Sequence, residues 1–178
     1  MKNNELIIRS QNIIFNNLKN KIESNNYKSA YFFYDKFHRN KINKILHIIG
    51  IPMIVWSSFL ATHGTKIMNK RLSTILYLIY SINYIRLDKV LGILSSFFYY
   101  LIYHHSLNLY IKYKKREKGI FKYVFFTQLF AWLLQFYGHK YYEKNKPALL
   151  TGFKQSFTMA PLFVIDHLYK YIKNIIKI

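Results

Sequence analysis

The sequence predicts an all-helical protein: a multi-pass integral membrane bundle with about four short or tilted spanning helices and further amphipathic or re-entrant segments. Of its 178 residues, 52% are hydrophobic, and they gather in long blocks joined by short basic connectors. These blocks lack the polar face that a soluble helix presents at every turn. Clean alternation is missing and Gly and Pro are few, so strands are not favoured. A soluble bundle with a buried core is the alternative.

The first segment, residues 1–27, is polar and rich in Asn and Lys. Its apolar residues recur at roughly helical spacing, which suggests an amphipathic helix lying on a membrane or on the rest of the protein. No early apolar run precedes it, so a secretory signal peptide is not expected. We expect residues 28–178 to form a single membrane-embedded domain.

Five apolar runs follow, at residues 45–61, 72–85, 90–103, 120–137 and, more weakly, 149–169. A spanning helix needs ~20 apolar residues, and the first four runs lie at or below that length. They are too many and too aromatic for the core of one soluble bundle of this size.

The charge balance excludes several classes of protein. The chain has 27 Lys and Arg against 7 Asp and Glu, a formal net charge of +20. These basic residues are spread between apolar segments instead of covering one soluble face, so nucleic-acid binding is not expected. The absence of Cys excludes disulfide scaffolds, zinc ribbons, iron–sulfur proteins and cysteine enzymes.

Histidine is the residue type that most suggests chemistry. Ionisable groups at membrane depth are costly and tend to be functional, and imidazole is the commonest metal ligand. A single histidine at the end of an apolar run is more often a hydrogen-bonded structural residue, so the number and grouping matter. The seven histidines are His38, His47, His63, His104, His105, His139 and His167.

The first group is the pair His38 and His47. They are nine residues apart, which is about 900° on a straight helix and puts them on opposite faces. A break near residues 40–43 would let both point to one centre, and the two asparagines there favour such a break. We expect Asn43 to cap the first membrane helix and Pro52 to kink it.

The second group follows the fourth apolar run. Gln135, His139 and Glu143 are spaced by four, so they line one face if the helix persists. Gly138 would let a neighbouring helix or ligand approach closely, and Pro147 marks the end of the segment. A helix with a polar stripe at its exit from the membrane is the plainer interpretation.

Topology joins the two groups. A chain that enters the membrane after His47 and crosses it four times returns to the same face just before His139. The histidine-bearing ends of the first and fourth helices would then be neighbours at one membrane surface. A metal site acting on a lipid head group belongs at such a place.

These motifs resemble those of a known family. Tyr34, His38, Asn43, His47 and Gly50-Ile51-Pro52 are similar to the opening motif of the endoplasmic-reticulum 2-hydroxy fatty acid dioxygenases. A second motif of that family resembles residues 132–149, with Trp132, Gln135-Phe136, Gly138-His139, Glu143 and Pro147-Ala148-Leu149. The third resembles Ala160-Pro161-Leu162-Phe163-Val164. The resemblance runs in family order from about Lys28 to Tyr169.

The resemblance implies a multi-pass enzyme of the endoplasmic-reticulum membrane that uses Fe(II) and O₂. It implies removal of one carbon from a 2-hydroxy fatty acid, an α-oxidation step in phytosphingosine breakdown. His38, His47 and His139 match motif positions and are the expected iron ligands; weaker candidates are His63, His104 and His105. Residues expected to contact substrate or support the ligands are Asn43, Gln135, Glu143, Arg39 and Lys140.

The sequence departs from that pattern in two places. Asp166 stands where many relatives carry Glu, which keeps a carboxylate. Arg39 stands where some carry a second histidine, so no ligand is expected there. The alternative to an enzyme is a non-enzymatic multi-pass membrane protein, with structural histidines and basic connectors that bind lipid head groups.

Overall fold

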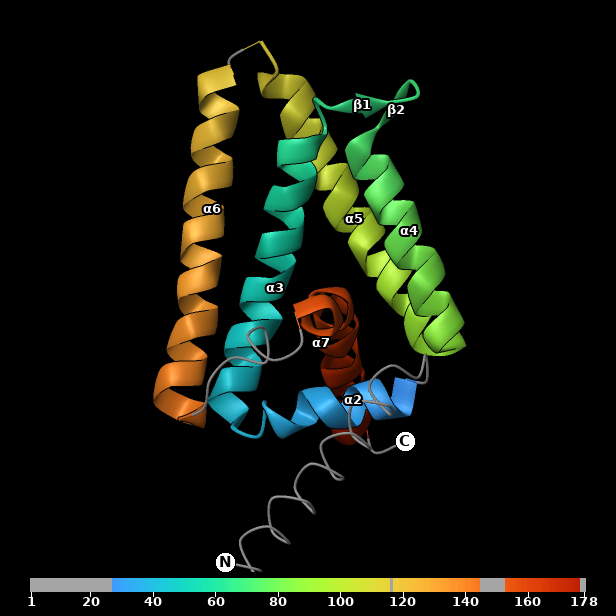
Figure 1. The fold of residues 1–178 in the computed structure, drawn as a ribbon, viewed down its shortest axis with the longest axis vertical. Coiled ribbons are helices and arrows are strands. Elements are labelled where there is room, and N and C mark those ends of the chain that lie inside the picture. Colours follow the sequence, from blue (N-terminus) through green and yellow to red (C-terminus); the bar gives the residue numbers. More distant parts are fainter. Residues whose placement is uncertain (1–26, 116, 145–152, 177–178) are drawn as a thin grey trace, which may run out of the picture.

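The computed structural model describes residues 27–115, 117–144 and 153–176, and its long elements are all helices (Figure 1). The all-α prediction is therefore confirmed. The helix expected within residues 1–27 and the end expected at Pro147 lie outside the described residues, apart from Tyr27. The elements are α2 (Tyr27–Lys36), α3 (Lys41–Thr62), β1 (Lys66–Ile67), β2 (Lys70–Arg71), α4 (Leu72–Leu87), α5 (Lys89–Tyr113), α6 (Glu117–Tyr137), the π-helix η1 (Gly138–Glu143) and α7 (Phe153–Ile176).

Helix α3 is the axis of the bundle. It packs against α6 on one side and against α5 on the other, while α4 and α5 form an antiparallel pair. Helix α2 runs across the lower ends of the upright helices in Figure 1, and α7 contacts α2, α3 and α5. The small strand pair β1–β2 caps the opposite end.

The break expected near residues 40–43 is present, because α2 ends at Lys36 and α3 begins at Lys41. The capping residue is Asn40 and not Asn43: its side-chain oxygen accepts from the Ile42 backbone N–H at 2.8 Å. Asn43 instead lies inside the first turn, fully buried. Pro52 is accommodated within α3, which continues to Thr62.

The buried core joins α2, α3, α4, α5 and α7. Its centre is aromatic as well as aliphatic, in agreement with the many Tyr and Phe residues of the sequence. The motif expected at residues 160–164 lies on the face of α7 that packs into the core. Ile165, the next residue, belongs to the same buried face. The buried residues of this core are Tyr34, Ile51, Tyr84, Leu91, Tyr99, Met159, Leu162, Phe163, Val164 and Ile165.

Two helical segments, Lys41–Thr62 and Gly119–Glu143, are long and apolar enough to cross a membrane. In the most apolar stretch of each segment, only 33% and 11% of the residues, respectively, are buried inside the protein. The core helix of a soluble domain would be mostly buried. Helix α4, with 16 residues, is shorter than the ~20 that a span requires. Large apolar side chains such as Ile82, Ile93 and Phe97 nevertheless stand exposed on α4 and α5.

Gly92 permits the close approach of α4 and α5. A Cβ at this position would lie 2.5 Å from the Cα and N of Ile85 and from the carbonyl carbon of Tyr84. These are backbone atoms and cannot turn aside as a side chain can. Gly119, in α6, has nothing within 4 Å of an added Cβ.

We therefore expect Gly92→Ala to separate α4 from α5 and to lower the free energy of unfolding by about 1–3 kcal/mol, the usual cost of overpacking. Gly119→Ala is the matched control, because alanine is favoured over glycine in a helix by about 0.5–1 kcal/mol. Thermal unfolding of both variants in detergent measures the difference. Equal stability of the two variants would contradict the close packing at Gly92.

Candidate metal centre

Three buried histidines meet between the start of α3 and the end of α6. The ring centroids of His38 and His47 are 4.4 Å apart, and that of His139 lies 4.8 Å and 5.0 Å from them. One ring nitrogen from each lies within 4.8 Å of the others. All three side chains are less than 8% exposed. The group can hold a metal ion.

Hydrogen bonds fix the protonation of two of these rings. His38 Nδ1 donates to the Tyr34 carbonyl oxygen and His47 Nδ1 donates to that of Asn43, each at 2.9 Å. A carbonyl oxygen only accepts, so both protons are on Nδ1 and both Nε2 atoms carry lone pairs. These two Nε2 atoms face each other at 3.0 Å. Two lone pairs at that distance repel unless a cation lies between them.

The arrangement fits a metal ion. Metal–imidazole bonds of about 2.1 Å that meet at a right angle hold their nitrogens about 3.0 Å apart. A hydrogen bond from the other ring nitrogen to a backbone carbonyl is also how metal-binding histidines are usually oriented. Nδ1 of His139 is buried and has no hydrogen-bond partner in the described part of the chain. The third ring therefore has a nitrogen that no other group uses.

The turn that carries His139 is a π-helix. Residues Gly138–Glu143 follow α6 with the wider π-helical turn, and Lys144 ends it in the left-handed region at φ 54°. Such turns often occur at functional sites because they redirect a side chain without ending the helix. Gly138 packs so closely on Asn43 that a Cβ would collide with the Asn43 side-chain oxygen. The close approach expected at this glycine is confirmed.

Glu143 ties η1 to the beginning of α3. Its Oε1 accepts from the Asn40 backbone N–H at 2.8 Å and from Asn43 Nδ2 at 3.0 Å. Asn40 is the cap of α3, and Asn43 also provides the carbonyl that orients His47. One carboxylate therefore joins the segment carrying His139 to the segment carrying the other two histidines.

Tyr34 completes the wall beside His38. Its ring stacks on His38 at 3.8 Å between centroids and on Phe163 of α7 at 4.1 Å. Burial raises the pKa of Tyr34 well above its ordinary value, so its hydroxyl stays protonated. Burial, followed by the charge of His47, lowers the pKa of His38 to about 2. A neutral imidazole is the form that binds a metal.

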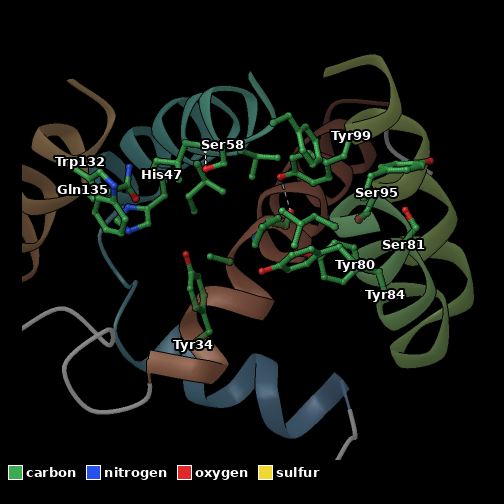
Figure 2. A pocket seen from close by; sticks show the side chains of 18 of the residues that line it. Tyr34, His47, Ser58, Tyr80, Ser81, Tyr84, Ser95, Tyr99, Trp132 and Gln135 are labelled. Carbon is green, nitrogen blue, oxygen red and sulfur yellow. Dashed lines mark hydrogen bonds between the residues drawn. The ribbon is translucent and has the colours of Figure 1, made fainter. Parts of the chain in front are cut away.

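The three histidines open into one cavity of about 240 Å³. It extends from the histidines between α3, α4, α5 and α7, and Figure 2 shows His47 and Gln135 at one end, with the Tyr34 hydroxyl pointing inward. Its walls are mostly apolar and aromatic. Among the described residues that line it there is no Lys, Arg, Asp or Glu.

The structure brings several expected residues to this centre. Gln135 is buried and donates from Nε2 to the Leu46 carbonyl oxygen at 3.2 Å, in space left by the missing side chain of Gly50. Asn43 and Glu143 support the histidines as described above. Arg39 and Lys140 are exposed and do not line the cavity.

The weaker histidine candidates lie elsewhere. His63 caps the far end of α3, about 24 Å from His47 along the helix. Its two ring nitrogens are engaged by Ser73 at 2.7 Å and Ser106 at 2.9 Å. His105 accepts from Trp56 Nε1 at 2.9 Å and, like His104, is exposed. None of the three belongs to the metal-binding group found among the described residues.

Two comparisons find known relatives of this chain. A family model described as "2-hydroxy-palmitic acid dioxygenase Mpo1-like" matches residues 24–172. The 2-hydroxy-palmitic acid dioxygenase MPO1 of Saccharomyces cerevisiae is 31% identical over 149 residues, covering 80% of this chain and 80% of the relative. No solved structure matches the chain.

We expect the stability of the metal-free protein to fall as the pH drops below about 6.5. The unfolded chain protonates His38 near its ordinary pKa of 6.5, whereas the folded protein keeps it neutral to about pH 2. Acid therefore favours the unfolded chain, and the contribution of this group is lost progressively between those two values. Unfolding in detergent at a series of pH values measures this.

The His38→Gln variant should show a weaker dependence on pH over that range. His104→Gln, which changes an exposed ring, should keep the wild-type dependence. A wild-type stability that does not change between about pH 7.5 and pH 5 would contradict the burial of a neutral His38.

We expect Glu143→Ala to weaken metal binding by about 10-fold or more, because groups that support metal ligands have effects of that size. Loss of the carboxylate releases both Asn40 and Asn43 from η1. Lys140→Ala, an exposed change in the same turn, is the control. Titration of each purified variant with metal gives the affinity. An unchanged affinity in Glu143→Ala would contradict the role of Glu143 in holding η1 against the start of α3.

Proposed function

This chain belongs to the 2-hydroxy-palmitic acid dioxygenase Mpo1-like family, and from this premise we propose that it is an Fe(II)-dependent dioxygenase that shortens 2-hydroxy fatty acids by one carbon. The family resemblance seen in the motifs is thereby confirmed. The match to a hydroxy fatty acid dioxygenase supports the activity and the use of O₂. The place proposed for this step is fatty acid α-oxidation during phytosphingosine breakdown.

The observation that carries the proposal is the buried group of His38, His47 and His139 at the end of an apolar cavity. We propose these three residues as the protein ligands of the iron. Three imidazoles leave positions open for other ligands, as in sites where non-haem Fe(II) reacts with O₂. When bound, the iron supplies activation of O₂ and a positive charge.

That charge accounts for how an acid can enter this cavity. A buried carboxylate is very costly unless it is paired, and no Lys or Arg lines the cavity among the described residues. The head group of the substrate therefore belongs at the histidines. The Tyr34 hydroxyl, kept protonated by burial, is placed beside His38 to donate a hydrogen bond there. The acyl tail extends away between the apolar walls.

The proposed reaction balances with one O₂. The bond between C1 and C2 breaks, C2 becomes the carboxyl carbon of the shortened acid, and C1 leaves as CO₂. One water forms. The four electrons lost by the two carbon atoms are those that reduce O₂, so no other reductant is needed.

We propose that the enzyme works in the membrane of the endoplasmic reticulum, with α3, α4, α5 and α6 as four short or tilted spans. The two segments long enough to cross and the apolar side chains exposed on α4 and α5 support this. A membrane also supplies the substrate, because a fatty acid partitions into lipid.

Replacement of a proposed ligand should remove the metal and the activity together. We expect His38→Ala, His47→Ala and His139→Ala to lose bound iron and to lower the rate of 2-hydroxypalmitate shortening at least 100-fold, since a missing ligand disables the site. His104→Ala, an exposed change, should keep both. Iron content and formation of the odd-chain acid by detergent-solubilised protein measure these effects. Full activity in all three variants would contradict the proposal.

A further inference from the structure

The end of the cavity far from the histidines carries polar groups that nothing in the proposed reaction uses. Figure 2 shows Ser81, Tyr84 and Ser95 at the opposite end from His47. All three side chains are more than nine-tenths buried. Their hydroxyl oxygens are fully enclosed and have no hydrogen-bond partner within the described part of the chain.

These hydroxyls differ from others along the same cavity. Ser58 and Ser96 donate to the carbonyl oxygens of Ile54 and Gly92, each at 2.7 Å, as helical serines commonly do. The Tyr99 hydroxyl donates to the Pro161 carbonyl oxygen at 3.1 Å. Ser81 and Ser95 are helical as well, yet neither makes such a bond.

The three hydroxyls come from the tightly packed pair α4 and α5. Gly92 brings the α5 backbone against Tyr84 and Ile85, so this end of the cavity is held by backbone contact. Buried hydroxyls without partners are costly and are normally satisfied by a ligand or by water. No lysine, arginine, histidine or carboxylate lines this cavity near them among the described residues. A group that they bind must therefore be neutral and able to form hydrogen bonds.

We propose that Ser81, Tyr84 and Ser95 form a second polar subsite, which binds a hydroxyl group on the tail of the fatty acid. The proposal rests on the proposed function for the position of the head group at the histidines. The subsite lies at the opposite end of the cavity from the histidines, so the chain length that places a terminal hydroxyl there is read from the binding experiment.

The test measures binding without turnover. Full-length protein in detergent, loaded with Fe(II) under anaerobic conditions, is titrated with 2-hydroxy acids of six to sixteen carbons, each with and without a terminal hydroxyl. Displacement of a fluorescent fatty acid gives the dissociation constants. At the chain length that places the terminal hydroxyl in the subsite, this hydroxyl should strengthen binding to the wild type. We expect the strengthening to be about 3- to 10-fold larger in the wild type than in Tyr84→Phe, Ser95→Ala or Ser81→Ala.

The chain supplies matched controls. Tyr99→Phe and Ser96→Ala remove hydroxyls that line the same cavity but are already bonded, so they should keep the wild-type preference. Tyr84→Phe should also bind the unsubstituted acid more tightly, because no unpaired hydroxyl then faces its tail. Each acid is equally soluble whichever variant it is titrated into. The greater solubility of the hydroxylated acids therefore has no effect on a comparison between variants.

Two results would overturn the subsite. One is an equal preference for the acids with a terminal hydroxyl in the wild type, Tyr84→Phe and Ser95→Ala at every chain length. That result would mean that the buried hydroxyls bind only water. The other is a preference lost equally in Tyr99→Phe. Failure of the proposed function gives a different result, because no product then forms from any acid. The dissociation constants of Tyr84→Phe and the wild type, with and without the terminal hydroxyl, still test the subsite in that case.

Discussion

The structure depends on two imidazole nitrogens that face each other with lone pairs. His38 and His47 both use Nδ1 to donate to a backbone carbonyl, and their Nε2 atoms meet at 3.0 Å in a buried place. A cation relieves this repulsion, and His139 adds a third nitrogen from a distant part of the chain. The helix break before α3, the π-helical turn and the Glu143 bridge all serve to keep these rings together.

The same arrangement gives the cavity its polarity. The cavity that opens from the histidines has no fixed positive side chain among its described lining residues, so the proposed acid would need an ion at that end to balance its charge. Tyr34 adds a protonated hydroxyl there. The apolar walls and the hydroxyls at the far end then favour a ligand that is acidic at one end and neutral along its length.

Much of this was accessible from the sequence, because spacing limits what a helix can do. The nine-residue interval between His38 and His47 requires a break, and asparagines mark where it occurs. The return of the chain to one face predicts the encounter with His139.

What could not be predicted depends on tertiary contacts. Asn40 caps α3, whereas Asn43 is buried and donates to Glu143, a residue 100 positions away, and the change from α- to π-helix has no local signal. The serine partners of both His63 ring nitrogens are 10 and 43 residues away along the chain, so no local pattern predicts them.

X-ray absorption at the iron edge of the anaerobically reconstituted protein tests the central claim most directly, because it reports the atoms bound to the metal whether or not turnover occurs. The account predicts about three imidazole nitrogens per iron, falling by one in each single variant of His38, His47 or His139 that still retains metal. A spectrum with only oxygen ligands, or one that these substitutions leave unchanged, would contradict it.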